Sequence, residues 1–296
     1  MKLQQAFDTF LIDQQIRGNT PKTVRYYTQS IGRYIDFVVD DPPLSEIDLK
    51  GLRAYYIHLS GRGLSSTTVQ TYIRALRAFL RWCYEEEYIP LNWAEKFRLP
   101  KAKQNVVDVL TDLEVSCLLD CFNLRYIIHL RNYCVCSLML DSGLRLNEVV
   151  TLTTKHLHIP EGYCIVDGKG NKQRIVPLGL HTRKMLSRYL ARRPGCVDTD
   201  RVFLMSNMRP ITDNTLHLMF QKLKQRSGIG RMRAHLLRHT FATRYLENGG
   251  DMYALQQILG HKSLEMVKRY VHTTTRKLVP TYTEYSPMDS YMRTKK

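Results

Sequence analysis

Apolar side chains recur three and four positions apart through the first hundred residues, and this spacing predicts a series of helices. The first helix would cover 3–17 and end at Gly18. Thr20-Pro21 would begin the second, with Thr20 as N-cap, and its apolar face runs to Val38. A third would begin with Ser45 as N-cap and reach about Leu59. A fourth would open at Ser65 and bury the stripe Val69, Ile73, Leu76, Phe79 and Leu80.

The pattern after residue 107 predicts more helices, interrupted by one β-hairpin. Thr111 and Glu114 have the spacing of a capping box, a helix from about 124 to 141 would stop at Gly143, and a short helix would start near Arg145. Alternating β-formers at 163–166 and 174–176 flank a glycine-containing turn at 168–171, which predicts the hairpin. Further helices are predicted at 180–192, 213–226, 235–247, 252–259 and near 264–271. The expected fold class is therefore mainly α with a small β-sheet.

The periodic pattern breaks between Pro90 and Val107, where core-forming residues are scarce and basic residues are frequent. We interpret 99–107 as a linker between two domains, 1–98 and 108–296. Nine extended residues span up to about 30 Å, so a basic linker could let two domains grip one duplex from different sides. An ordinary surface linker would have the same composition.

Charge is the first indication of function. The 296 residues carry a formal net charge of +17, and residues 1–98 contribute 13 Lys+Arg against 11 Asp+Glu, so the excess lies almost wholly beyond residue 98. Such a field favours a polyanionic partner, with a merely basic soluble surface as the alternative. No apolar run could span a bilayer, and Asp8 and Asp13 argue against a signal peptide, so we expect a cytoplasmic protein without a membrane partner. The seven cysteines form no CxxC pair, and no metal site is expected.

Several residues could act together on a phosphate. His235 and Arg238 are three apart, so one helix face would present both, and Arg145 would open a helix whose free N–H groups also favour an anion. Lys169 lies in the predicted hairpin turn, where an ammonium could approach and leave a ligand. His261 follows the helix stop Leu259-Gly260, and Tyr270 lies among cations that favour its phenolate. Each residue alone also has an ordinary structural explanation, such as a surface ion pair or a solvated turn.

Their order along the chain is more specific. The chain resembles the tyrosine recombinase (phage integrase) family in five segments that together span most of 108–275: Ser142-Gly143-Leu144-Arg145-Leu146-Asn147-Glu148, Gly168-Lys169-Gly170-Asn171-Lys172-Gln173-Arg174, His235-Leu236-Leu237-Arg238-His239-Thr240-Phe241-Ala242-Thr243, Leu259-Gly260-His261, and Tyr270. Residues 1–98 resemble the family's helical, SAM-like core-binding domain more loosely. The resemblance implies that 108–296 is the catalytic domain, with a tail that contacts a neighbouring protomer.

The resemblance also implies a mechanism. Tyr270 would attack a DNA phosphate to form a 3′-phosphotyrosyl link, while Arg145 and Arg238 hold the phosphate and Lys169 protonates the leaving 5′-oxygen. His235 would assist proton transfer from Tyr270, and His261 would hydrogen-bond a non-bridging oxygen. Glu148 would support the catalytic groups without contacting the DNA itself. Bond energy is conserved, so no cofactor, ATP or metal is expected.

The expected partner is double-stranded DNA that carries specific recombination sites. Four protomers, or this chain with a related recombinase, would exchange strands through a Holliday junction, with accessory DNA-bending proteins as further partners. Candidate DNA contacts in the first domain lie at two helix starts: Lys22, Thr23, Arg25, Thr67, Thr68 and Arg74. Solvated helix faces would show the same residues.

Length and the absence of a third domain resemble the Xer recombinases, whereas Pro280 and Pro287 interrupt the tail and resemble integrases of transposons and conjugative elements. We therefore expect a mobile-element integrase, with Xer-type dimer resolution as the alternative. A type IB topoisomerase would differ by relaxing supercoils as a monomer. A non-catalytic DNA-binding protein would form no covalent complex with a nicked substrate.

Overall fold

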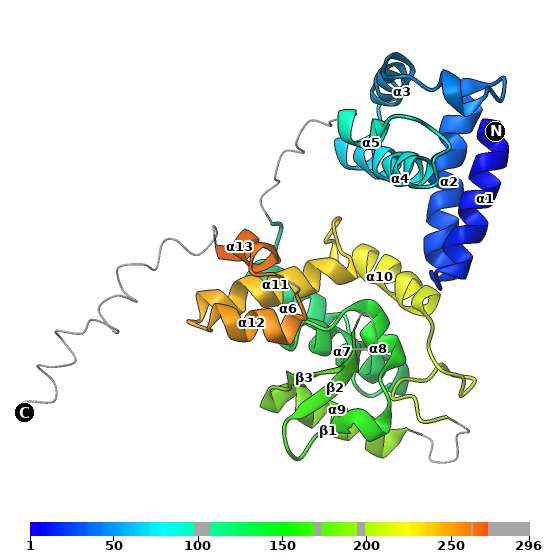
Figure 1. Ribbon diagram of the computed structural model, residues 1–296. Coiled ribbons are helices and arrows are strands. Elements are labelled where there is room, and N and C mark those ends of the chain that lie inside the picture. The colour runs from blue at the N-terminus through cyan, green and yellow to red at the C-terminus, as the bar shows by residue number, and fades with distance from the viewer. Residues whose placement is uncertain (98–106, 169–172, 194–198, 262, 272–296) are drawn as a thin grey trace, which may run out of the picture. The chain divides into compact units, whose positions relative to one another are not determined.

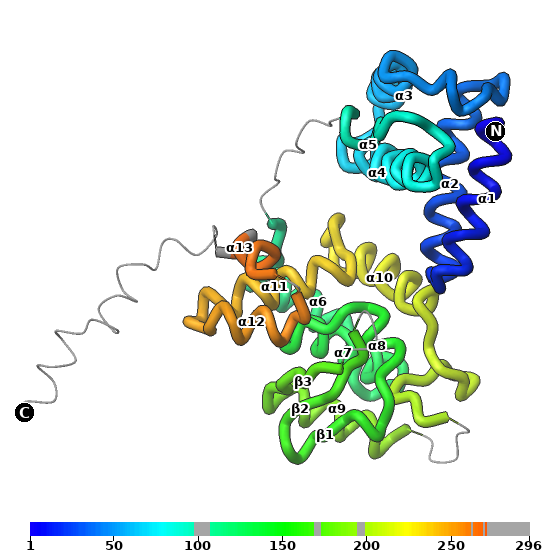
Figure 2. Tube along the Cα trace, viewed as in Figure 1, coloured from blue at the N-terminus to red at the C-terminus, as the bar shows by residue number. Residues whose placement is uncertain are grey.

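The computed structural model describes residues 1–97, 107–168, 173–193, 199–261 and 263–271. Lys169, residues 99–106 of the predicted 99–107 linker and the tail beyond 271 lie outside these residues. The chain divides into two compact units, an amino-terminal unit of Met1–Asn105 and a carboxyl-terminal unit of Val106–Lys296. Figures 1 and 2 follow the course of the chain through each of them. None of the helices in the described residues is both long and apolar enough to cross a membrane.

The amino-terminal unit is entirely helical in its described residues, with α1 Leu3–Ile16, α2 Pro21–Val38, a short 3-10 turn at Leu44–Glu46, α3 Leu49–Gly61, α4 Ser66–Glu85 and α5 Trp93–Lys96. Helix α4 is central, since it packs against α1, α2, α3 and α5. Its predicted stripe, from Val69 to Leu80, is buried as expected. Aromatic rings form much of this core: Phe10 meets Tyr27, Phe79 and Trp82 edge-on, with ring centroids 5.1–5.5 Å apart.

Two of the three predicted helix starts in this unit are confirmed. The Thr20 side chain accepts a hydrogen bond from the Thr23 N–H, and the Ser65 side chain accepts one from Thr68. The prediction that Ser45 begins the third helix is wrong. Leu44 and Ile47 both enter the core, so the chain forms a 3-10 turn there, and Asp48 caps α3 by accepting the Gly51 N–H at 2.7 Å.

The carboxyl-terminal unit contains α6 Asp112–Asp120, α7 Ile127–Asp141, α8 Leu146–Thr151, a 3-10 turn at Thr154–His156, β1 Leu157–His158, β2 Tyr163–Asp167, β3 Gln173–Pro177, α9 Leu180–Arg192, α10 Asp213–Ser227, α11 Ala234–Glu247, α12 Met252–Leu259 and α13 Glu265–Val271. The strands form one antiparallel sheet in the order β1-β2-β3, with Ile165 opposite Ile175. The predicted hairpin and the mainly α class with a small sheet are confirmed. The short elements α5 and β1 were not predicted.

Helix α7 lies at the centre of this unit, where every side chain from Tyr133 to Met139 is buried. It packs against α9 on one side and α11 on another. Cys134 and Cys136 are fully buried there among apolar neighbours, in keeping with their expected role as small apolar residues.

The chain turns sharply between α7 and α8, at Gly143, whose φ is +64°. A side chain on Gly143 would collide with the ring of Phe241 on α11 and with Leu259 on α12. Glycine is therefore needed both for the left-handed backbone and for this close approach, which brings the starts of α8 and α11 toward the end of α12.

Candidate functional site

Glu148 gathers the guanidinium groups at the start of α8. Its side chain is only 5% exposed, and its two oxygens accept hydrogen bonds from the Arg145 N–H, from Arg145 Nη1, and from Arg174 Nη1 and Nη2, each at 2.8 Å. Burial alone would raise the pKa of Glu148, but the bonds from Arg174 and Arg145 lower it overall. The carboxylate therefore stays ionised and fixes the direction of Arg145.

Arg174, on β3, was not singled out by sequence reasoning. Besides its two-pronged contact with Glu148, its Nε donates to the Ile258 carbonyl at 2.7 Å, so it joins the sheet to α8 and to the end of α12. Gly260 leaves room for it, because a Cβ there would lie 3.1 Å from the Arg174 side chain. The sequence shows Arg174 only as a basic residue after the hairpin turn. It does not show the partner, because Glu148 lies 26 positions away.

Arg238 lies one turn into α11 and is 5% exposed. Its Nη1 donates to the Gly143 carbonyl and its Nη2 to the Leu259 carbonyl at 2.7 Å, and Nη2 is 3.2 Å from Nε2 of His261. The guanidinium is thus held by the backbone of two separate turns. The start of α8, the first turns of α11 and the end of α12 thus meet at one place, which we call the junction. Three of the predicted residues, Arg145, Arg238 and His261, lie there.

The junction is strongly positive. Burial, reinforced by nearby Arg145, lowers the pKa of Arg238 to about 9, which still leaves it a cation at neutral pH. Within the described part of the chain, Arg238 has no carboxylate at ion-pair distance. His235 has an exposed side chain beside the same charges. Its partial desolvation, followed by Arg238, Arg145 and Arg233, lowers its pKa, which favours a neutral imidazole. A buried cation that lacks an ion-pair partner is suited to bind an anion such as phosphate.

Tyr270, on α13, is 1% exposed and packs with Phe241, Ala242, Leu255 and other apolar residues. Its hydroxyl lies 2.8 Å from Nδ1 of His239, a residue that sequence reasoning quoted only as part of a motif. The structure gives His235 no hydrogen bond to Tyr270 in the described residues. The phenol is close enough to Arg238 to affect the pKa of that guanidinium.

Of the predicted catalytic residues, Lys169 lies outside the described residues. The helix that Arg145 opens was expected to offer free N–H groups to an anion. Glu148 accepts the N–H of Arg145 itself at 2.8 Å, so that one group is already used by the helix cap.

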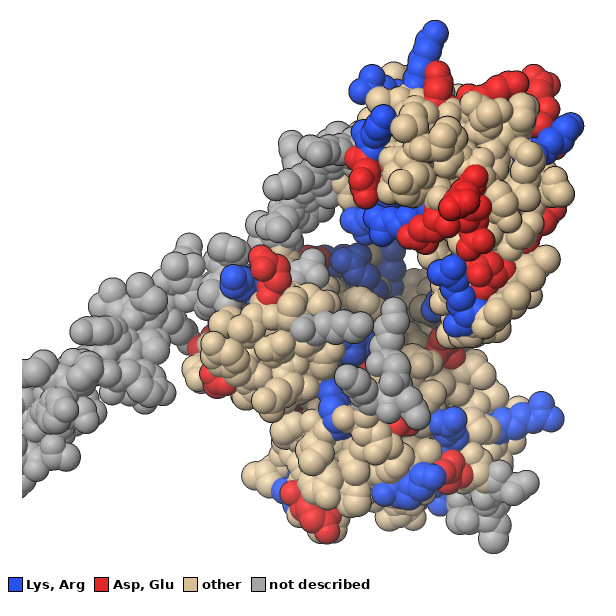
Figure 3. Space-filling model, viewed as in Figure 1, with Lys and Arg blue, Asp and Glu red and all other residues tan. Residues whose placement is uncertain are grey.

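The candidate DNA contacts of the amino-terminal unit lie at two neighbouring helix starts. The Tyr26 hydroxyl on α2 donates to the Thr71 carbonyl on α4 at 2.9 Å, which joins the second turns of both helices. The exposed members of the predicted set are Lys22, Arg25, Thr67 and Arg74, and the half-buried ones are Thr23 and Thr68. Figure 3 shows acidic and basic side chains interspersed on the visible face of this unit.

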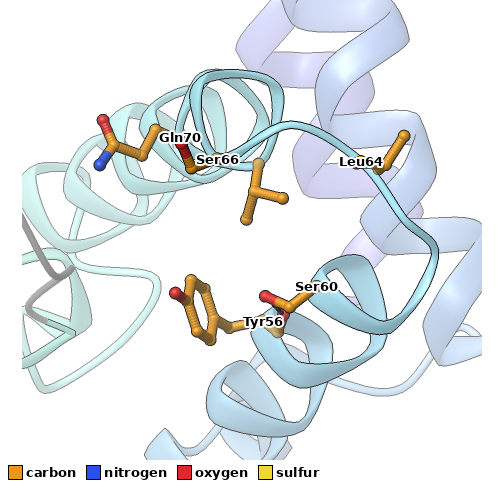
Figure 4. A pocket seen from close by; sticks show the side chains of 6 residues that line it. Tyr56, Ser60, Leu64, Ser66 and Gln70 are labelled. Carbon is orange, nitrogen blue, oxygen red and sulfur yellow. Dashed lines mark hydrogen bonds between the residues drawn. The ribbon is translucent and has the colours of Figure 1, made fainter. Parts of the chain in front are cut away.

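A small cavity of about 180 Å³ lies between α3 and α4 (Figure 4). Its lining includes Tyr56, Ser60, Leu64 and Val69. None of the predicted catalytic residues that the structure describes borders it, and its lining carries no charged side chain. It is therefore separate from the positive junction in the carboxyl-terminal unit.

Comparisons with known proteins agree with this architecture. The phage integrase family model matches residues 108–277, more than half of the chain, and a phage integrase SAM-like domain matches residues 3–99. The tyrosine recombinase XerD of Halalkalibacterium halodurans is 29% identical over 94% of this chain and 96% of its own length.

Solved structures show the same relationship. The XerA recombinase is 26% identical, with a TM-score of 0.53 over 96% of this chain and 99% of its own. The Tn1549 transposon integrase, solved with transposon right end DNA, is 20% identical, with a TM-score of 0.77 over 97% of this chain and 99% of its own. The chain belongs to the phage integrase family, the tyrosine recombinases, and is a site-specific DNA recombinase.

Proposed function

We propose that the junction of α8, α11 and the α12–α13 turn binds the phosphate at which DNA is cut, and that Tyr270 is the nucleophile. The observation that carries this proposal is the buried Arg238, which is a cation without an ion-pair partner among the described residues and lies beside Arg145. Two fork-shaped guanidinium groups suit the equatorial oxygens of a phosphate in its transition state.

The remaining assignments complete a transesterification. Tyr270 Oη forms a 3′-phosphotyrosyl bond as the bond to the 5′-oxygen breaks, and Lys169 supplies the proton to that oxygen. His261, 3.2 Å from Arg238, would donate to a non-bridging oxygen. Glu148 would orient Arg145 through their hydrogen bond. His235, among the cations, belongs to the phosphate side of the site. None of these steps uses a cofactor.

A nicked DNA substrate tests the nucleophile, because the short strand released on cleavage diffuses away and leaves the enzyme covalently attached. Tyr270→Phe should lose all covalent complex while binding DNA nearly as the parent does in a mobility-shift assay. Tyr253→Phe is the matched control, since Tyr253 is 60% exposed on α12 and should cleave normally. Covalent product from Tyr270→Phe would exclude Tyr270 as the nucleophile.

The two units would act together on one half-site. We infer that residues 1–98 form the core-binding domain and residues 108–296 the catalytic domain, joined by 99–107. The matches of the two family models to residues 3–99 and 108–277 support this division. The amino-terminal halves of α2 and α4 would contact the duplex through Lys22, Arg25 and Arg74. We further propose that four protomers assemble on DNA and that the residues after Tyr270 contact a neighbouring protomer. A related recombinase or DNA-bending proteins would be further partners, and the protein would act in the cytoplasm.

Two biological roles remain in competition. The similarity to XerD over nearly the full length supports Xer-type resolution of DNA multimers, which we now favour over our expectation of a mobile-element integrase. The fold shared with a transposon integrase keeps the second role as the alternative. Sequencing DNA covalently trapped by the enzyme in its host would separate them: a single chromosomal locus indicates resolution, and the ends of an excisable element indicate integration.

A further inference from the structure

Helix α11 presents two histidines one turn apart, and their surroundings differ. His235 and His239 are four positions apart, so they share a helix face, with ring centroids separated by 6.3 Å. A histidine of this kind can take up a proton near neutral pH, so either is chemically able to act as a base toward Tyr270. The geometry distinguishes between them.

His235 faces the phosphate end of the site. Its side chain is exposed, whereas that of His239 is half-buried. After partial desolvation, the groups that act on the pKa of His235 are Arg238, Arg145 and Arg233. All three are cations, and two of them are the proposed phosphate ligands. A neutral imidazole in this place can hydrogen-bond a phosphate oxygen, but it lies one helical turn away from the residue that contacts the tyrosine.

His239 faces the nucleophile. Its Nδ1 and the Tyr270 hydroxyl share a hydrogen bond of 2.8 Å, and the two rings lie 5.7 Å apart at 48°. Tyr270 is 1% exposed and enclosed by Phe241, Ala242 and other members of an apolar cluster. Bulk water is therefore poorly placed to take the phenolic proton, whereas an imidazole nitrogen already lies at hydrogen-bonding distance.

We propose that His239 is the base of the cleavage step, a role that rests on the proposed function of Tyr270. With its ring proton on Nε2, His239 accepts the Tyr270 proton at Nδ1. The O–H bond of Tyr270 breaks as Oη forms a bond to phosphorus, and the bond from phosphorus to the 5′-oxygen breaks as that oxygen takes its proton from Lys169. Rejoining reverses these transfers, and the imidazolium of His239 returns its proton to Tyr270.

The test is single-turnover formation of the covalent complex by the full chain on the nicked substrate. His239→Ala should react about 10²- to 10⁴-fold more slowly at neutral pH, the usual contribution of a positioned general base. The deficit should shrink as the pH rises toward about 10, where tyrosine ionises without help. Added imidazole should restore part of the rate in proportion to its unprotonated fraction, and pyrazole, which has the same ring size but is a much weaker base, should not.

Matched variants separate a base from a packing residue. His239→Gln keeps a polar side chain without basicity and should lose as much activity as His239→Ala, which also covers the case in which the alanine variant folds poorly. His217→Ala, at an exposed position on α10, should cleave like the parent. His235→Ala should be slow and should not respond to imidazole.

Several results would overturn the assignment. If His239→Ala or His239→Gln cleaves as fast as the parent, or faster, the contact only holds Tyr270 in the DNA-free protein. If pyrazole rescues as well as imidazole, the ring only fills space. Imidazole rescue of His235→Ala alone would transfer the role to His235. Tyr270→Phe separates the assignment of the base from that of the nucleophile. If Tyr270→Phe forms no covalent complex while His239→Ala cleaves normally, His239 is rejected as the base and Tyr270 is kept as the nucleophile.

Discussion

The cores of the two units differ in what they bury. In the amino-terminal unit the only polar side chains that are buried among the described residues are Gln14 and Ser30, and aromatic and aliphatic groups fill the rest. Within its described residues, the carboxyl-terminal unit buries three charged side chains, Arg131, Glu148 and Arg238, together with several hydroxyl groups. Burying a charge is costly unless it is paired and hydrogen-bonded.

The difference shows where function constrains the fold. Arg131 and Arg238 are both held by backbone carbonyls, Arg131 by Leu204 at 2.8 Å and Arg238 by Gly143 and Leu259. Only Arg238 lies beside further cations at the proposed phosphate site. The carboxyl-terminal unit thus keeps a desolvated positive charge ready for an anion, whereas the amino-terminal unit carries its charges on its surface.

A spectroscopic asymmetry allows the two units to be followed separately. Both tryptophans of the chain, Trp82 and Trp93, belong to the amino-terminal unit. Tryptophan fluorescence therefore reports unfolding of that unit, and far-ultraviolet circular dichroism reports unfolding of both. The comparison between the cores can be tested with these two signals.

The largest effect is expected from Glu148→Ala. This change leaves part-buried Arg174 and half-exposed Arg145 without their carboxylate, which should cost the carboxyl-terminal unit about 3–5 kcal/mol in free energy of unfolding. Denaturant titration should show an earlier transition by circular dichroism and an unchanged one by tryptophan fluorescence. Glu161→Ala, at an exposed position, is the control. An equal shift in both signals would mean that the two units do not unfold separately.

A smaller loss of stability, confined to the amino-terminal unit, is expected from Ile73→Val. Ile73 is fully buried on α4, and removal of one methyl group from an apolar core costs about 0.5–1.5 kcal/mol. The fluorescence transition should shift, and covalent cleavage of the nicked substrate should not change. Reduced cleavage without reduced stability would show that the amino-terminal core influences the chemical step.

The smallest effect is expected from mild acid. The pKa of Glu148 is lowered from its ordinary value of 4.5, so its ion pairs stabilise the fold above that value and lose this contribution as the pH falls through the lowered pKa. The difference in melting temperature between the parent and Glu148→Gln should therefore be nearly constant from pH 7 to 5 and shrink below about 4.5. A difference that grows with acid would contradict the sign of this linkage.

Local chemistry made most of the fold predictable. Thr20, Ser65 and Thr111 each cap the helix they were expected to cap, because a cap is formed by residues within one turn of each other. The start of α3 was missed because burial of Leu44 and Ile47 overrides the local preference of Ser45. The elements α5 and β1, of four and two residues, are too short to carry a periodic pattern.

The sequence offered candidate residues for the site but not the contacts among them. Segment order singled out Arg145, Arg238, His261 and Tyr270 as candidates. Nothing local could show that Tyr270 is buried against His239, 31 positions earlier, or that Glu148 pairs with Arg174. These contacts depend on how α8, α11, α13 and β3 pack, which periodicity does not encode.

Helix α11 carries a further consequence. Within fourteen residues it holds His235, Arg238 and His239, and seven of its side chains are buried, including Leu236, Leu237 and Thr243. Thr240 also accepts the Leu110 N–H, so even its hydroxyl is committed. A helix with so few uncommitted positions leaves little room for neutral drift. Divergence of this enzyme toward new target sequences is therefore expected to accumulate in other segments while this helix stays almost fixed.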